Sequence, residues 1–354
     1  MKKKSIAFVA LTVASALVLS ACAGGGQSAP GTEGQGYEPI VIYSNSVSDG
    51  RGAWLTAEAQ KAGFDIQYVD LGGADVMNRL IAEKANPVAD VVFGLNQVYY
   101  EKLDAEGVLA ESRPAWADMV DAETFGNGST YWPIVREPIM LVYDTSVFSG
   151  ATAPRDWPDL WTESRFENRY ETPAALGGAT TQMVLAGILS RYRDDAGALG
   201  VSDEGWAAIG QYFSRGNRQV EGEDLYARMA AGVVAAGPMW LAGKATREEQ
   251  YGVETAAASP QGGVPMVAQS IAIVEGTGKA ATATAFLDWF GGADVQSAWS
   301  EAFFTVPTNA DALAGANPQA VEETDAFAMQ DIDWEFVAAN IDAWIERIEL
   351  EYLG

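Results

Sequence analysis

The 354-residue chain contains no histidine and only one cysteine, Cys22. Histidine is a common general base and metal ligand, so its absence removes both of those uses. A Ser-His-Asp or Cys-His catalytic group therefore cannot form. The Gly-x-Ser-x-Gly, Walker A and Gly-x-Gly-x-x-Gly motifs are also missing. These absences exclude the most familiar hydrolase and nucleotide-binding sites, and we expect neither a cofactor nor a bound metal ion.

Basic residues are scarce as well. The chain has 22 Lys and Arg against 48 Asp and Glu, which gives a net charge of −26. A nucleic-acid-binding protein needs the opposite sign, so nucleic acid is excluded as a partner. The acidity would suit a site for cations, but a solvated acidic surface that keeps the protein soluble explains it more simply.

The N-terminus has the organisation of an export signal. Three lysines at residues 2–4 are followed by an uncharged, mostly apolar run at residues 6–18 and then by small residues. The apolar run is shorter than the about 20 residues that a bilayer-spanning helix needs. Residues 22–37 are rich in glycine, with serine, proline and glutamine, which is the composition of a flexible tether.

Leu-Ser-Ala-Cys at residues 19–22 resembles the lipobox of bacterial lipoproteins, whose signal is cut before the cysteine that then carries the lipids. The resemblance implies that residues 1–21 are a removed signal peptide. It also implies that Cys22 anchors the mature protein to the extracytoplasmic face of the cell membrane, because two or more acyl chains hold a protein there stably. The alternative is an ordinary secretory signal with an incidental cysteine.

Strand and helix patterns alternate after the tether. Apolar or β-branched runs at residues 39–43, 64–69 and 88–93 predict strands, and residues 52–62, 76–84 and 97–105 predict helices. This alternation favours a parallel sheet with helices on its faces.

A second α/β unit is predicted beyond residue 130. We expect two extended segments around Glu137-Pro138, a strand at 233–237 that Pro238 ends, and a strand at 265–274. Helices are expected at 182–191, 205–214, 225–231, 282–290, 295–302 and, with Asp333 as its cap, 334–352. We find no internal repeat and no transmembrane span.

Six segments of the chain form a recognisable series. They are Ala-Asp-Val-Val-Phe at 89–93, Leu-Asp-Ala-Glu-Gly-Val-Leu at 103–109, Val-Arg-Glu-Pro-Ile-Met-Leu-Val-Tyr-Asp at 135–144, Gly-Gly-Ala-Thr-Thr at 177–181, Phe-Thr-Val-Pro-Thr at 304–308 and Asp-Ile-Asp-Trp at 331–334. Together they resemble the extracellular solute-binding proteins of ABC importers. Within that superfamily they are most similar to the ferric-iron type, whose relatives bind 2-aminoethylphosphonate, thiamine, polyamines or sugar phosphates.

The resemblance implies an α/β fold of two doubly wound lobes joined by crossing hinge strands, the type II periplasmic-binding-protein fold. The first lobe would comprise residues 38–133 and 264–305, and the second residues 134–263 and 306–354. A small solute would bind between the lobes, which close by hinge motion and then dock on the membrane permease. The protein would act as a monomer and would not be an enzyme.

Ligands of open α/β sheets collect at the carboxyl ends of the strands. Polar and aromatic residues at those ends and at the strand crossing are therefore the candidate ligand-binding residues, namely Tyr43, Ser44, Asn45, Ser46, Asn96, Gln97, Trp132, Arg136, Gly178, Thr180, Thr181 and Trp240.

The loop at residues 177–181 is the most informative of these segments. Its glycines let the backbone approach a ligand, and the free amides of a helix start favour an anion. The equally plain interpretation is a glycine turn with threonine capping. Iron-binding members of the family that this chain resembles use two adjacent tyrosines, and Tyr99-Tyr100 is such a pair. The family's pair, however, corresponds to the region near residues 237–240, where this chain has no tyrosine. Direct Fe³⁺ ligation by that set is therefore not expected, and we place Tyr99 and Tyr100 on a helix, one of them packed inward.

An organic anion such as a phosphonate or sugar phosphate is favoured as the solute. Iron or an iron complex, a polyamine and thiamine stay open, since Trp132 and Trp240 would suit a cation or a ring. Tryptophans are nevertheless more often part of a core. The alternative function is a secreted lyase or carbohydrate-active enzyme using paired carboxylates. A third alternative is an adhesion or scaffold protein, which would lack a cavity between lobes.

Overall fold

The computed structural model describes residues 36–353. The expected signal peptide at 1–21, the expected lipidation site Cys22 and nearly all of the expected tether at 22–37 lie outside this range. Across residues 36–353, no helix combines the length and the apolar character that crossing a membrane would require.

Three parallel strands open the fold, as the sequence predicts. β1 (Ile40–Ser44) pairs with β2 (Ile66–Asp70) on one side and with β3 (Val91–Phe93) on the other. Successive residues of a strand point to opposite faces of the sheet. Ile40 and Ile42 are accordingly buried in one hydrophobic cluster, while Tyr43 is buried in another on the opposite face.

Helices cover both faces of this sheet. One face packs against α1 (Arg51–Lys61), α10 (Ala280–Phe290) and α11 (Ala293–Phe303). The other packs against α2 (Gly73–Glu83) and α3 (Gln97–Ala105). The three predicted β-α repeats are therefore confirmed, with helix boundaries within three residues of the expected ones.

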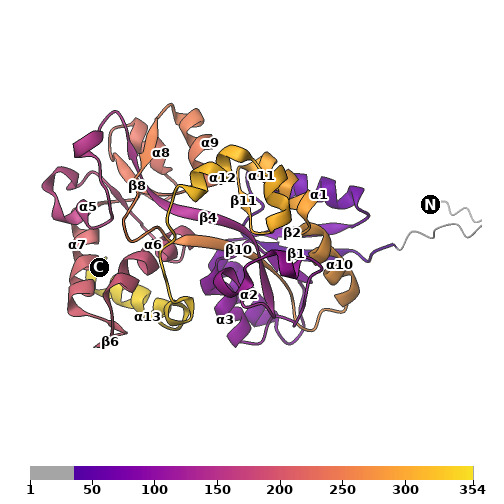
Figure 1. Ribbon diagram of the computed structural model, residues 1–354. Helices are drawn as coiled ribbons and strands as arrows, with labels where there is room; N and C mark the ends of the chain where they lie inside the picture. The colour runs from indigo at the N-terminus through magenta and orange to yellow at the C-terminus, as the bar shows by residue number, and fades with distance from the viewer. Residues whose placement is uncertain (1–35, 354) are drawn as a thin grey trace, which may run out of the picture. The chain divides into compact units, whose positions relative to one another are not determined.

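Two long strands continue the sheet beyond this unit. β10 (Met266–Ile273) lies antiparallel between β3 and β4 (Tyr131–Asp144), and the short β11 (Val306–Pro307) pairs with the far side of β4. From Ile139 onward, β4 pairs instead with β8 (Ala236–Trp240) and β9 (Thr255–Ala257). The first half of β4 thus pairs with β10 and β11, and its second half pairs with β8 and β9 (Figure 1).

Two predictions about prolines are wrong. The two segments expected around Glu137-Pro138 form one continuous strand, because Pro138 lies where β4 changes partner from β10 to β8 and its missing N–H interrupts neither ladder. Pro238 does not end a strand either. It lies inside β8 opposite Leu141, and a strand paired with β4 on one side tolerates a proline whose missing N–H faces the other.

The second group of elements packs around β8 and the latter half of β4. Ile139 and Leu141 enter a large cluster rich in aromatic side chains, and Met140 and Val142 enter a smaller cluster on the opposite face. The helices of this group are α5 (Asp159–Thr162), α6 (Ala179–Leu189), α7 (Asp203–Arg215), α8 (Leu225–Ala230), α9 (Leu241–Tyr251) and α13 (Trp334–Tyr352).

The long C-terminal helix confirms its prediction closely. In α13, Val337, Ile341, Trp344 and Ile348 are buried on one face, and Asp333 caps the helix by accepting the Phe336 amide at 2.9 Å. Patterning misses several shorter or more polar elements, which are α4 (Ala122–Phe125), α5, β6 (Arg193–Ala198), β7 (Asn217–Arg218), α9, β9 and α12 (Pro318–Asp325). The sequence does predict an extended segment at residues 170–173, and β5 (Glu171–Thr172) lies there, paired with β7.

The two groups have largely separate hydrophobic clusters, and we call the groups lobe 1 and lobe 2 (Figure 1). Val98 of α3 is an exception, because it is buried in the large cluster of lobe 2. Lobe 1 holds β1–β3, α1–α3, α10 and α11. Lobe 2 holds α5–α9, β8, β9 and α13. β4 and β10 lie between them, and we call these two the crossing strands.

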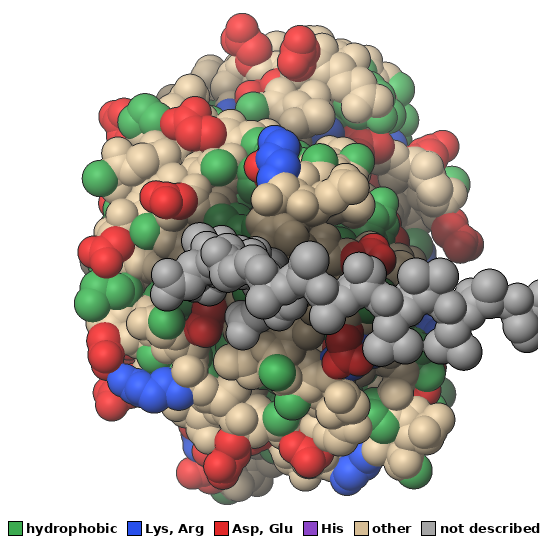
Figure 2. All heavy atoms as spheres, turned by 90° about the vertical axis from the view of Figure 1, so that its right-hand side faces the viewer, with side chains coloured by type: hydrophobic (Ala, Val, Ile, Leu, Met, Phe, Trp, Pro, Cys, Tyr) green, Lys and Arg blue, Asp and Glu red, His purple; other side chains and the backbone are tan. Residues whose placement is uncertain are grey.

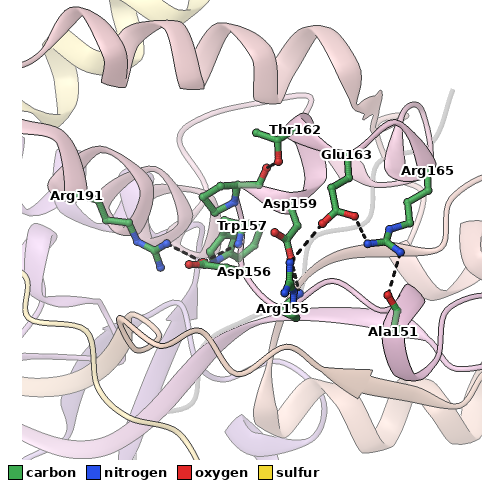
Figure 3. Close-up of polar contacts among 10 residues, drawn as sticks. Ala151, Arg155, Asp156, Trp157, Asp159, Thr162, Glu163, Arg165 and Arg191 are labelled. Atoms are coloured by element: carbon green, nitrogen blue, oxygen red, sulfur yellow. Dashed lines mark hydrogen bonds and ion pairs between the residues drawn. The ribbon is translucent and has the colours of Figure 1, made fainter.

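A chain of surface ion pairs holds the segment around α5 in lobe 2 (Figure 3). Arg191 contacts Asp156 at 2.7 Å, and Arg155 contacts Asp159 at 3.4 Å. Arg165 pairs with Glu163 and donates to the Ala151 carbonyl at 2.9 Å. Exposed pairs contribute little each, so the anchor of this segment is the neighbouring Trp157, which is 1% exposed.

The acidity of the chain is spread over its surface. Figure 2 shows acidic side chains scattered across the visible face, with few basic ones among them. This distribution agrees with a solvated acidic surface and does not single out a cation site on that face.

Candidate functional site

A cavity of about 240 Å³ is bordered by both lobes and by the crossing strands. Lobe 1 contributes the loops after β1 and β3 and the first residue of α1. Lobe 2 contributes the start of α6 and the end of β8. Of the candidate residues from the sequence, Asn45, Ser46, Asn96, Thr180 and Trp240 line this cavity.

The lobe 1 wall is built by a close approach of two loops. The Ser44 hydroxyl accepts the Ser46 amide at 2.9 Å, and the Ser46 hydroxyl donates to Gln269 Oε1 at 2.8 Å. Gly94, which follows β3, has φ +95°, and a Cβ atom there would lie 2.6 Å from Cβ of Ser46. Only glycine fits this position, because it combines a left-handed conformation with a contact that excludes a side chain.

Arg51 is the basic residue among those that line the cavity, and sequence reasoning missed it. It is the first residue of α1, and its guanidinium carbon lies 5.6 Å from the centre of the Phe303 ring. It belongs to no recognised motif and follows an exposed polar loop. The one available signal was an arginine close after the first strand of a chain poor in basic residues.

Three buried polar atoms of cavity-lining residues have no hydrogen-bond partner within the described part of the chain. They are Asn45 Oδ1, Arg51 Nε and Asn96 Nδ2. Asn96 is 1% exposed, and its other amide atom, Oδ1, accepts the Tyr99 amide at 3.2 Å. An unpaired buried polar group costs about 1–3 kcal/mol. Two donors and one acceptor are therefore available to a polar ligand.

Lobe 2 presents the N-terminus of α6 to the same cavity. Gly178 precedes the helix, and no side chain caps it. Among residues 36–353, the amides of residues 179–181 have no backbone or side-chain acceptor, while the Gln182 amide already bonds to Gly178. Free amides and the helix dipole attract negative charge. Ala179 and Thr180 both border the cavity.

Glu137, from β4, forms the floor of the cavity and is 5% exposed. Its Oε1 accepts the Ala242 amide at 2.8 Å, and its Oε2 lies 3.4 Å from Nε2 of Gln269. Burial raises the pKa of Glu137, an effect that the nearby Arg51 charge and these two hydrogen bonds partly offset. The carboxyl group therefore links a crossing strand to the first turn of α9.

We expect Glu137→Gln to change how stability depends on pH. The folded protein holds the Glu137 proton above the ordinary pKa of 4.5, where the unfolded chain has lost it. The stability that this group contributes is thus complete below pH 4.5 and declines as pH rises through the raised pKa. Glutamine keeps an oxygen for the Ala242 amide but does not titrate, so the stability of the variant relative to that of the wild type should rise progressively with pH above 4.5.

Urea denaturation of both proteins at a series of pH values measures this difference. A gap between variant and wild type that stays constant with pH would contradict the assignment. Burial also raises the pKa of Glu171. This residue is present in both proteins, so its contribution to the pH dependence cancels in the comparison.

Trp240 borders the cavity at the end of β8, with the Arg247 guanidinium carbon 4.6 Å from the centre of its ring. Thr181 borders a neighbouring cavity of about 220 Å³ within lobe 2, together with Thr180, Met239 and Trp240. Thr180 and Trp240 therefore lie between the two cavities.

The remaining candidates have structural contacts outside the cavity. The Tyr43 hydroxyl donates to Glu83 at 2.9 Å, and Ser44 bonds within its own loop. Gln97 bonds to the Met266 carbonyl and the Ala268 amide, each at 3.0 Å, which fastens α3 to β10. Tyr43, Ser44 and Gln97 therefore support the residues of lobe 1 that line the cavity without lining it themselves.

Trp132 and Arg136 lie on the lobe 1 half of β4, also away from the cavity. The Trp132 indole is buried in the lobe 1 core and donates to the Ser112 carbonyl at 3.0 Å. Arg136 pairs with Asp325 of α12 at 2.6 Å. Neither side chain is among those that line the cavity.

Tyr99 and Tyr100 lie on α3, as expected, and both are fully buried rather than one alone. The Tyr99 hydroxyl donates to the Gly177 carbonyl, and the Tyr100 hydroxyl to the Ser270 carbonyl. Over residues 36–353, no three His, Cys, Asp or Glu side chains are arranged to hold a metal ion.

The sequence matches the family model described as bacterial extracellular solute-binding protein over residues 86–340. The chain belongs to this family of solute-binding proteins. It is 32% identical over 314 residues to the "Probable ABC transporter periplasmic-binding protein y4fP" of Sinorhizobium fredii, a match that covers 89% of this chain and 86% of that protein.

A second relative is the "Putative 2-aminoethylphosphonate-binding periplasmic protein" of Salmonella typhimurium. It is 27% identical over 180 residues, which are 49% of this chain and 48% of the relative.

Solved structures confirm the two-lobed type II periplasmic-binding-protein fold. The periplasmic binding protein P5PA superposes with a TM-score of 0.73 at 20% identity, over 89% of this chain and 99% of that one. A ferric binding protein from Campylobacter jejuni gives 0.74 at 15% identity, over 88% and 99%. AfuA from Actinobacillus pleuropneumoniae, solved with fructose-6-phosphate, gives 0.70 at 17% identity, over 89% and 98%. The alternative of a secreted lyase or carbohydrate-active enzyme gains no support from these relatives.

Proposed function

We propose that this protein captures a small organic anion between its lobes and delivers it to the permease of an ABC importer. One observation carries the choice of an anion: the Arg51 guanidinium and the uncapped N-terminus of α6 border one cavity from different lobes. A guanidinium and free helix amides are the groups that recognise phosphate and phosphonate oxygens. The name of the Sinorhizobium relative supports the transporter role.

A phosphonate or a sugar phosphate fits this site best. The names of two related proteins refer to 2-aminoethylphosphonate and fructose-6-phosphate, and both compounds carry a phosphorus oxyanion next to polar groups. Asp49 also borders the cavity and would attract an ammonium group beside the oxyanion. Asn45 Oδ1 offers an acceptor to the same ammonium or to a hydroxyl.

A solute held in this way would favour lobe closure. A ligand shifts a conformational equilibrium only by its difference in affinity for the two states. Contacts to Arg51 in lobe 1 and to α6 in lobe 2 exist together only when the lobes meet. We propose lobe boundaries at residues 38–133 with 264–305 and at 134–263 with 306–354, with β4 and β10 as the hinge, and a monomer that binds without catalysing a reaction.

Native mass spectrometry of freshly purified protein tests the proposal, because a tightly held solute is retained. Calorimetry with 2-aminoethylphosphonate, fructose-6-phosphate, spermidine and thiamine then ranks the classes of solute. We expect one of the two phosphorus compounds to bind. Binding of spermidine or thiamine alone, or chemical turnover of a bound compound, would overturn it.

We also propose that residues 1–21 are removed and that Cys22 is lipidated, which would tether the protein outside the cell membrane. The support is the placement of the single cysteine at the end of a signal-like segment. Cys22→Ser should abolish incorporation of labelled fatty acid and move the protein from the membrane fraction to the soluble extracytoplasmic fraction. Full membrane retention of the serine variant would contradict lipidation at this residue.

A further inference from the structure

A buried tyrosine joins the two lobes directly at the edge of the solute site. The Tyr99 hydroxyl, on α3 of lobe 1, donates to the Gly177 carbonyl of lobe 2 at 2.8 Å. Tyr99 is fully buried, whereas Gly177 is exposed and precedes Gly178, the N-cap of α6. The bond therefore fixes the loop that sets the direction of the free α6 amides.

The ring of Tyr99 is held rigidly on its own side. A Cβ atom at Gly73, in the first turn of α2, would lie 2.7 Å from Cε2 of the ring and 3.3 Å from Nδ2 of Asn45. The backbone amide of Tyr99 also donates to Asn96 Oδ1, which leaves Nδ2 of Asn96 as one of the unpaired donors of the cavity. Tyr99 thus bonds to Asn96 and, like Asn45, lies close to Gly73.

We infer that Tyr99 is a positioning residue for solute binding: its hydroxyl holds the α6 N-terminus in line with Asn45, Asn96 and Arg51 across the cavity. Tyr99 is not among the residues that line the cavity, so it acts through Gly177 and not by touching solute. The inference rests on the proposed anion site for its effect on affinity. Its effect on the 177–181 loop does not depend on which solute binds.

The adjacent tyrosine offers a matched control. Tyr100 is equally buried, but its hydroxyl donates to the Ser270 carbonyl and lies 3.2 Å from the Val92 carbonyl, both on strands of the central sheet. Tyr99→Phe and Tyr100→Phe each remove one hydroxyl from a buried ring on the same helix. Tyr99→Phe removes the hydrogen bond to Gly177. Tyr100→Phe removes a hydrogen bond to Ser270 instead and leaves the contact to Gly177 in place.

Hydrogen exchange of the unliganded proteins, followed on peptides that cover residues 176–184, tests the loop. We expect faster exchange there in Tyr99→Phe and wild-type exchange in Tyr100→Phe. With 2-aminoethylphosphonate or fructose-6-phosphate as the probe, Tyr99→Phe should bind about 3- to 10-fold more weakly, the effect of one lost hydrogen bond, mainly through faster dissociation.

Unchanged exchange in Tyr99→Phe, or the same change in both variants, would overturn the positioning role. If neither probe binds the wild type, the proposed solute class fails, and the exchange measurement still decides the role of Tyr99.

Discussion

Arg51→Ala is expected to weaken binding of an anionic solute by roughly 30- to 700-fold. Removing one partner of a desolvated charge pair costs about 2–4 kcal/mol, which corresponds to that range at 25 °C. Arg51 Nε has no hydrogen-bond partner among residues 36–353, so it can donate to an oxyanion without giving up an internal hydrogen bond. Calorimetry with 2-aminoethylphosphonate and fructose-6-phosphate measures the change.

Arg136→Ala is the matched control for this variant. Arg136 is the arginine that the sequence pattern proposes for the site, but its guanidinium pairs with Asp325 outside the cavity. We expect its removal to change affinity by less than about 5-fold, since Arg136 does not line the cavity and a partly exposed pair contributes under 1 kcal/mol. Equal losses in both variants, or a larger loss at Arg136, would show that the anion is not held by Arg51.

Thr180→Asp is expected to abolish anion binding, by at least about 100-fold, without unfolding the protein. The new carboxylate would lie in the first turn of α6, where an acidic residue suits the helix dipole and should not destabilise the fold. The same carboxylate would occupy and repel the position of a bound anion, and like charges brought together cost several kcal/mol. Calorimetry gives the affinity, and thermal unfolding checks the fold.

Thr180→Asn separates charge from shape in this experiment. Asparagine has nearly the size of aspartate but no charge, so it should retain much of the affinity. If aspartate leaves the affinity unchanged, the N-terminus of α6 is not part of the site. If asparagine and aspartate are equally damaging, crowding and not charge is responsible.

The hydrophobic pattern of the sequence predicts much of the fold. The repeats from β1 to α3 and the buried stripe of α13 were predicted because each depends on local periodicity and capping. The errors at Pro138 and Pro238 share another cause. Whether a proline ends a strand depends on which neighbour lies beside its missing N–H, and that neighbour comes from a distant segment.

The sequence also predicts part of the site, because several of its positions are defined by the local pattern of strands and helices. Asn45, Ser46, Asn96 and Thr180 follow strands or begin helices, and the rule for open α/β sheets selects such positions. Trp132 and Arg136, by contrast, were proposed because they lie at the strand crossing. The rule does not say to which face of a crossing strand a side chain points.

Sequence patterning alone established the alternating α/β elements, the glycine-rich helix start at residues 177–181 and the absence of histidine chemistry, because each is a property of consecutive residues or of composition. Only the tertiary structure brought Arg51, Glu137 and α6 to one cavity and set Tyr99 against Gly177. These partners are distant in the chain, and the pairing of the crossing strands with both lobes decides which of them meet.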